Sequence, residues 1–128
     1  MRQSRIIAVD HVILEAPYGL DDRLRWFYGD LGHLEEVPPA AASAASMCFR
    51  SDRIELRIRF TESPLIDPIQ TRVTLLVPSL FEAKQLLEEQ SIAYATISGF
   101  AYTDRRLAIL DPAGHRVELK QSWPEVTL

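Results

Sequence analysis

The sequence lacks most of the features that would assign a chain to a specialised class. Its 128 residues include one cysteine, Cys48, so no disulfide can form within the chain. Acidic residues outnumber lysine and arginine by 18 to 14, and no basic run occurs, which argues against a nucleic acid partner. The apolar runs are too short to span a bilayer, and nothing resembles a secretion signal or a glycine-rich phosphate loop. We therefore expect a cytoplasmic protein, away from membranes, whose partner is a small molecule or another protein.

An internal repeat organises the sequence, whose length fits one compact domain spanning the whole chain. The segment RIELR at 53–57 returns as RVELK at 116–120, an offset of 63 residues (116 minus 53). HVILEAP at 11–17 aligns with RVTLLVP at 72–78, an offset of 61 (72 minus 11). A period of this length is too long for a solenoid unit. We interpret the chain as two copies of one supersecondary module.

Each module is predicted to run strand, helix and then three strands. Period-2 alternation of apolar residues marks the strands, and apolar residues at helical spacing mark the helices. This pattern predicts an α+β fold of two tandem βαβββ modules, with curved mixed sheets that form a cleft. The expected ranges are module one at about 5–60, a proline-containing linker at about 61–70 and module two at about 71–122, with strands at 6–14, 34–37, 47–50, 54–60, 72–77, 93–97, 106–110 and around Glu118, and helices at 20–31 and from the capping residue Ser79.

The candidates for chemistry lie at positions that the repeat matches. They are His11 and Glu55 in the first copy and Arg72 and Glu118 in the second. His11 is either a cleft residue or an uncharged histidine satisfied within the core, and Glu55 faces either the cleft or solvent. Glu118 needs a partner if it is buried, because an isolated carboxylate is costly to bury.

Several motifs, taken in order, resemble one superfamily. They are DHV at 10–12, FY at 27–28 in a helix that ends in LG at 31–32, and DPxGxxxEL at 111–119. Their order and spacing resemble the vicinal oxygen chelate superfamily, which includes glyoxalase I, the bleomycin and fosfomycin resistance proteins and the extradiol dioxygenases. The resemblance covers nearly the whole chain. It implies two modules that curl around a cleft, with metal ligands from the first and last strands of each, and a homodimer.

The sequence departs from that superfamily at one implied ligand position. The implied set is His11, Glu55, the position of Arg72, and Glu118, but a protonated guanidinium has no lone pair to donate to a metal. We therefore favour a polar cleft without a complete metal site and without a cofactor, in which Arg72 pairs with Glu118 or Glu55. The alternative is a divalent metal (zinc, nickel, manganese or iron) held by His11, Glu55 and Glu118 with water.

Three functions remain open from the sequence. The first is a binding protein that resembles the bleomycin-resistance branch and sequesters a small molecule. The second is a metal-dependent lyase or isomerase that resembles glyoxalase I, in which Glu118 or Glu55 moves a proton. The third is a protein-interaction domain with an occluded cleft. The predicted cleft residues are His11, Glu55, Arg57, Arg72, Thr74 and Glu118, with Glu118 as the catalytic candidate.

Overall fold

The computed structural model describes residues 11–52, 54–69, 72–98 and 105–122, excluding the side chains of Arg72 and Ser98. Residues 6–10, which begin the first predicted strand, lie outside this description. The elements in chain order are β1 (His11–Ala16), α1 (Asp21–Leu24), η1 (Arg25–Leu31), β2 (Glu35–Val37), β3 (Met47–Ser51), β4 (Ile54–Phe60), β5 (Arg72–Val77), α2 (Leu80–Glu89), β6 (Ala95–Ser98), β7 (Arg105–Leu110) and β8 (Arg116–Gln121).

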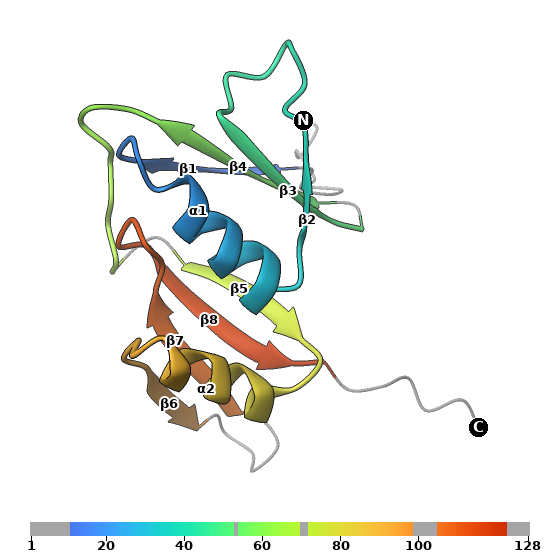
Figure 1. Ribbon diagram of the computed structural model, residues 1–128, viewed down its shortest axis with the longest axis vertical. Coiled ribbons are helices and arrows are strands. Elements are labelled where there is room, and N and C mark those ends of the chain that lie inside the picture. Colours follow the sequence, from blue (N-terminus) through green and yellow to red (C-terminus); the bar gives the residue numbers. More distant parts are fainter. Residues whose placement is uncertain (1–10, 53, 70–71, 99–104, 123–128) are drawn as a thin grey trace, which may run out of the picture.

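The strands form two four-stranded mixed sheets, one for each module (Figure 1). The first sheet has the order β1-β4-β3-β2 and the second has the order β5-β8-β7-β6. In each sheet the first and last strands of the module pair in parallel, and the other pairs are antiparallel. A parallel pair needs a long crossover, and the helix and following strands of each module supply it. The predicted α+β fold of two βαβββ modules is therefore confirmed.

The pairing register decides which polar residues are neighbours. In module one, β1 and β4 pair residues 44 positions apart (55 minus 11), so His11 lies beside Glu55. The strands β5 and β8 keep the same separation (118 minus 74), which places Thr74 beside Glu118. Thr74 therefore occupies beside Glu118 the position that His11 occupies beside Glu55. The alignment of Arg72 with His11 in the repeat is wrong. A shift of two residues preserves the face of a strand but moves the side chain about 7 Å along it, which is why alternation did not reveal the error.

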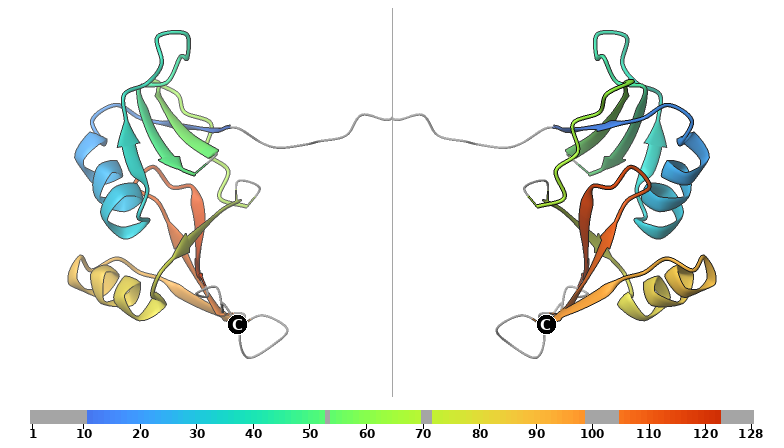
Figure 2. Two further views of the ribbon diagram at one scale, coloured as in Figure 1. Left: turned by 90° about the vertical axis from the view of Figure 1, so that its right-hand side faces the viewer. Right: turned by 90° about the vertical axis from the view of Figure 1, so that its left-hand side faces the viewer.

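Both helical regions lie on the same side of the two sheets (Figure 2). The first begins as α1 and continues as η1, whose wide π-helical turns include a 2.9 Å hydrogen bond from Gly32 N to the Phe27 carbonyl. The second, α2, begins as predicted, because Ser79 Oγ accepts a 3.2 Å hydrogen bond from Glu82 N. None of the helices in the described parts of the chain is long and apolar enough to cross a membrane.

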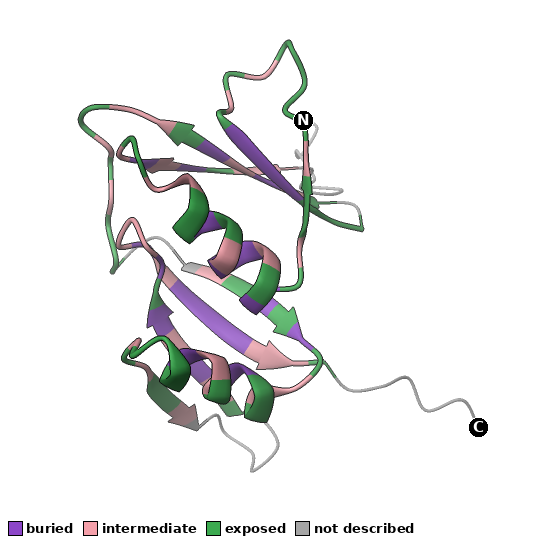
Figure 3. Ribbon diagram, viewed as in Figure 1, coloured by how far each residue is buried: buried purple, intermediate pink, exposed green. Residues whose placement is uncertain are grey.

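The first helical region packs between the two modules (Figures 1 and 3). Four of its side chains, Leu24, Phe27, Tyr28 and Leu31, are at most 1% exposed. The Tyr28 ring lies 5.6 Å from that of Phe49 in β3, while its hydroxyl reaches module two. The buried residues of both modules belong to one hydrophobic core. The helix, called here the wedge, therefore contacts both modules.

Gly32, directly after η1, has no room for a side chain. A Cβ there would lie 2.9 Å from the Tyr28 carbonyl oxygen and 3.0 Å from Leu75 Cδ1. Gly32 has φ −84° and ψ −9°, which alanine adopts readily, so close packing and not backbone conformation requires glycine here.

We predict that Gly32→Ala lowers the free energy of unfolding by about 1–3 kcal/mol, because the methyl group meets a backbone atom that cannot move alone. Gly29→Ala is the matched control, since its Cβ would meet nothing closer than the Leu34 carbonyl at 3.9 Å. The control should be neutral or stabilising by up to about 1 kcal/mol, as expected for alanine replacing glycine in a helix. Urea denaturation measures both changes. Equal stability of the two variants would show that a methyl group is accommodated at Gly32.

Candidate functional site

Most of the polar positions predicted from the repeat lie on the sheet faces that the helices leave uncovered, called here the open faces. Leu56, Leu75 and Leu119 belong to the hydrophobic core. Because successive side chains in a strand point to opposite faces, their neighbours Glu55, Thr74 and Glu118 belong to the open faces. His11 shares the open face with Glu55, its strand partner.

Glu55 is held by two arginines on its own sheet. Arg50 Nη2 lies 2.9 Å from Glu55 Oε1, and Arg57 Nε lies 3.1 Å from Oε2. The Cys48 thiol donates a longer hydrogen bond of 3.5 Å to the same carboxylate. The hydrogen bond from Arg50, followed by those from Arg57 and Cys48, lowers the pKa of Glu55 to about 2. Glu55 is therefore ionised at neutral pH, with its charge already balanced.

Glu118 has an equivalent arrangement on the second sheet. Arg106 Nη1 lies 3.4 Å from Glu118 Oε2, and Arg116 Nη2 lies 3.4 Å from Oε1. Glu118 is only 8% exposed, and a buried carboxylate needs a partner. These two guanidinium groups are its partners. Two carboxylates, one on each open face, are thus each paired with two arginines.

The arginines that balance these carboxylates are Arg50 and Arg57 for Glu55, and Arg106 and Arg116 for Glu118. The Arg72 side chain lies outside the described residues, so its predicted contact with Glu118 or Glu55 stays a prediction. In the backbone pairing, Arg72 lies beside Arg116, which is two residues before Glu118 on β8.

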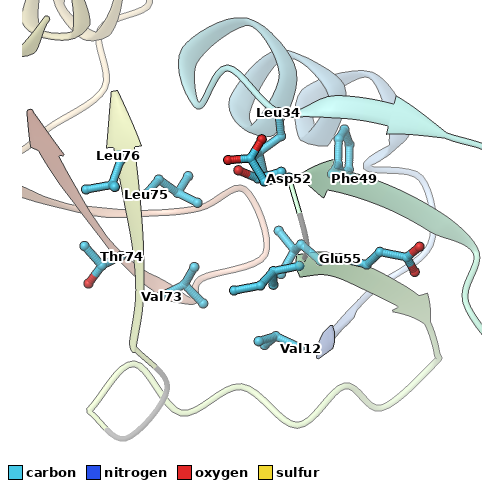
Figure 4. Close-up of a pocket in the computed structure, with 12 residues that line it drawn as sticks. Val12, Leu34, Phe49, Asp52, Glu55, Val73, Thr74, Leu75 and Leu76 are labelled. Atoms are coloured by element: carbon cyan, nitrogen blue, oxygen red, sulfur yellow. The ribbon is translucent and has the colours of Figure 1, made fainter. Parts of the chain in front are cut away.

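A cavity of about 950 Å³ lies between the two modules (Figure 4). Its described lining consists mainly of residues on the core side of their strands. Of the predicted cleft residues, Glu55 and Thr74 belong to this lining, and Figure 4 shows the Glu55 carboxylate directed away from Thr74. The described lining residues are Val12, Leu34, Phe49, Ser51, Asp52, Ile54, Glu55, Leu56, Val73, Thr74, Leu75 and Leu76.

Two polar contacts between the modules set the geometry around this cavity. The Tyr28 hydroxyl donates a 2.5 Å hydrogen bond to Asp111 Oδ2, while Asp111 Oδ1 accepts from the backbone N–H groups of Ala113 and His115 at 2.9 and 2.8 Å. The Nε2 atom of His115 lies 2.5 Å from the Glu15 carbonyl oxygen in β1. Burial, and then the charge of Asp111, raises the pKa of Tyr28 well above its ordinary value. Tyr28 therefore remains a neutral donor at physiological pH.

Comparison with known proteins gives a consistent result at the level of structure. No protein-family model matches the sequence, and no curated protein matches it significantly. Among solved structures, one described as a glyoxalase family protein from Bacillus anthracis has a TM-score of 0.75 at 24% identity, covering 95% of this chain and 100% of that one. Lactoylglutathione lyase from Agrobacterium tumefaciens has a TM-score of 0.66 at 20% identity, with 93% and 96% covered. The fosfomycin resistance protein FosX from Listeria monocytogenes has a TM-score of 0.70 at 15% identity, with 93% and 96% covered.

The chain has the fold of the vicinal oxygen chelate superfamily. The resemblance found in the motifs is confirmed at this level. Two of those motifs now have a structural role, because Tyr28 of the FY pair and Asp111 of the DPxG turn are hydrogen-bonded to each other. Gly114 completes the turn at φ 101°, a conformation that favours glycine.

The residues present do not fit the four-ligand metal site that the vicinal oxygen chelate resemblance implies. By register the donors would be His11, Glu55, Thr74 and Glu118. A neutral threonine hydroxyl is not among the usual protein ligands of zinc, and both carboxylates are engaged by arginine. Within the described ranges, no group of three histidine, cysteine, aspartate or glutamate side chains is arranged to hold a metal ion.

Sequence reasoning missed three arginines that hold the carboxylates, although one had a readable signal. The signal is the pair of adjacent predicted strands at 47–50 and 54–60. The observed β3 extends one residue further, to Ser51, and pairs Arg50 directly with Glu55. Arg106 and Arg116 depend on how β7 pairs with β8 and on side-chain directions, which alternation alone does not supply.

Proposed function

We propose that this protein binds a small molecule in the cavity between its two modules and works without a resident metal. The observation that carries the proposal is the cavity itself, which both modules line mainly with apolar side chains. Its volume of about 950 Å³ lies within the range of about 300–1,000 Å³ that is usual for ligand sites. Serine, threonine and carboxylate groups in the lining offer a few polar contacts, as is common in such sites.

The arginine pairs of Glu55 and Glu118 favour binding of a ligand over its chemical conversion. A general base works best with a pKa near the operating pH, whereas the pKa of Glu55 is about 2 and its oxygens already accept hydrogen bonds from Arg50 and Arg57. Glu118, the catalytic candidate, is held by Arg106 and Arg116. These pairings support sequestration of a ligand, the role suggested by the resemblance to resistance proteins, over proton transfer.

A metal-dependent lyase or isomerase is the second candidate, supported by the register of His11 beside Glu55 on an open face. Similar structures include both a lactoylglutathione lyase and a fosfomycin resistance protein, so the fold accommodates both kinds of function. In this candidate, His11, Glu55 and Glu118 would be the ligands. The four guanidinium groups would have to give way to the metal.

Metal titration separates the two candidates. In wild-type protein purified without chelator, we expect zinc, nickel and manganese to bind more weakly than about 0.1 mM by isothermal titration calorimetry. Thr74→His sets an imidazole beside Glu118, and we expect it to raise zinc affinity by about tenfold, equivalent to about 1.4 kcal/mol. Leu76→His is the control, because it adds the same group on the same face beside Lys120. Tight stoichiometric metal binding by the wild type would overturn the metal-free proposal and favour the lyase.

We also propose that two copies of the chain form a homodimer along β1 and β5. In the described residues each of these strands is paired on one side only, with β4 or β8. Both are six residues long and carry exposed apolar side chains on their open faces, Ile13 at 52% and Leu76 at 60%. Long apolar edge strands tend to be covered by another chain.

Light scattering tests the dimer. Wild-type protein should be dimeric at micromolar concentrations, and Leu76→Asp should shift it toward monomer, because a carboxylate is costly to bury in an interface. Phe81→Asp, which changes another exposed apolar residue on the outer side of α2, should leave the dimer intact. A wild-type monomer well above micromolar concentration, or equal effects of the two substitutions, would contradict this interface.

A further inference from the structure

The described lining of the cavity between the modules contains acidic but no basic side chains. Two ionisable residues, Asp52 and Glu55, are found in its described lining, and both are acidic. The other described lining residues are apolar apart from Ser51 and Thr74. A carboxylate at the edge of an apolar cavity attracts a cation and repels an anion.

The two carboxylates differ in what they can offer a ligand. Glu55 is balanced by Arg50 and Arg57, and its carboxylate points away from the β5 side of the cavity (Figure 4). Asp52 lies in the turn of the β3–β4 hairpin, where it is exposed and, in Figure 4, is drawn beside Leu34 at the edge of the cavity. Asp52 is therefore the carboxylate in the described lining whose charge can select a ligand.

The backbone does not dictate the charge at this position. Asp52 has φ 43°, in the left-handed region, where asparagine is at least as well accommodated as aspartate. Replacing Asp52 with asparagine therefore removes the charge and keeps the turn, which makes the effect of the charge measurable on its own.

We infer that the cavity selects an apolar molecule that carries a cationic amine. The apolar body lies between the two sheets among Val12, Phe49, Leu56 and Leu75, and the ammonium group lies at the edge beside Asp52. This inference rests on the proposed binding function and adds the chemical class of the ligand. It excludes ligands of the same shape whose polar group is an anion.

Three probes that share a naphthalene ring test the chemical class of the ligand. They are 2-naphthylmethylamine, 2-naphthalenemethanol and 2-naphthoate, which are cationic, neutral and anionic at pH 7. The amine should bind about two- to fivefold more tightly than the alcohol, the range expected for one solvent-accessible ion pair, and the naphthoate should bind most weakly. In Asp52→Asn, the amine and the alcohol should bind with equal affinity.

Substitutions at two neighbouring residues on opposite faces of β1 test whether the probes bind in the cavity. Val12→Phe fills the cavity and should reduce the affinity for all three probes at least fivefold, whereas Ile13→Phe places the same side chain on the open face and should leave the affinity unchanged. Circular dichroism and a thermal melt of each variant confirm that it is folded.

The outcomes distinguish this inference from the proposed function. If no probe binds the wild type, or if Val12→Phe and Ile13→Phe bind equally well, the cavity is not the binding site and both proposals fail. If the probes bind in the cavity but the naphthoate binds as tightly as the amine, or the preference for the amine survives Asp52→Asn, only the cationic class is overturned.

Discussion

The hydrogen bond between Tyr28 and Asp111 is the contact on which the arrangement of the two modules depends. A buried carboxylate is costly unless donors satisfy it, and Asp111 has three of them: one hydroxyl from module one and two backbone N–H groups in its own turn. Loss of the helix from its place between the sheets would leave this carboxylate without its donor from module one. The helical wedge is thus fixed to the β7–β8 turn by a polar contact and to both sheets by its apolar side chains.

In the proposed metal-free function, arginines balance the carboxylates on the open faces of the two sheets. Glu55 and Glu118 lie in equivalent places beside His11 and Thr74, but their negative charge is balanced by guanidinium groups from neighbouring strands. A divalent ion would have to displace these arginines and would find a threonine hydroxyl beside Glu118. The charge of each carboxylate is therefore balanced by arginines of its own sheet.

The parts of the structure that depend on local pattern could be predicted from the sequence. The β3–β4 hairpin, the Ser79 cap and the order of elements in each module follow from alternation, turn residues and helix capping, and all three are present. The residue of β5 that lies beside Glu118 could not be predicted, because a two-residue shift in β5 leaves the apolar pattern unchanged. The contact between Tyr28 and Asp111 joins residues 83 positions apart, and no local signal in the sequence predicts it.

Amide hydrogen exchange most directly tests the central claim that the wedge makes the two modules one structural unit enclosing a cavity. Amides in the middle of β4, in module one, and of β8, in module two, should exchange with the same free energy of opening, within about 1 kcal/mol, and that value should match the free energy of global unfolding. Both sheets would then open only when the whole chain unfolds. Exchange of the β8 amides at a clearly lower free energy than those of β4 would show that module two opens alone and that the modules do not share one core.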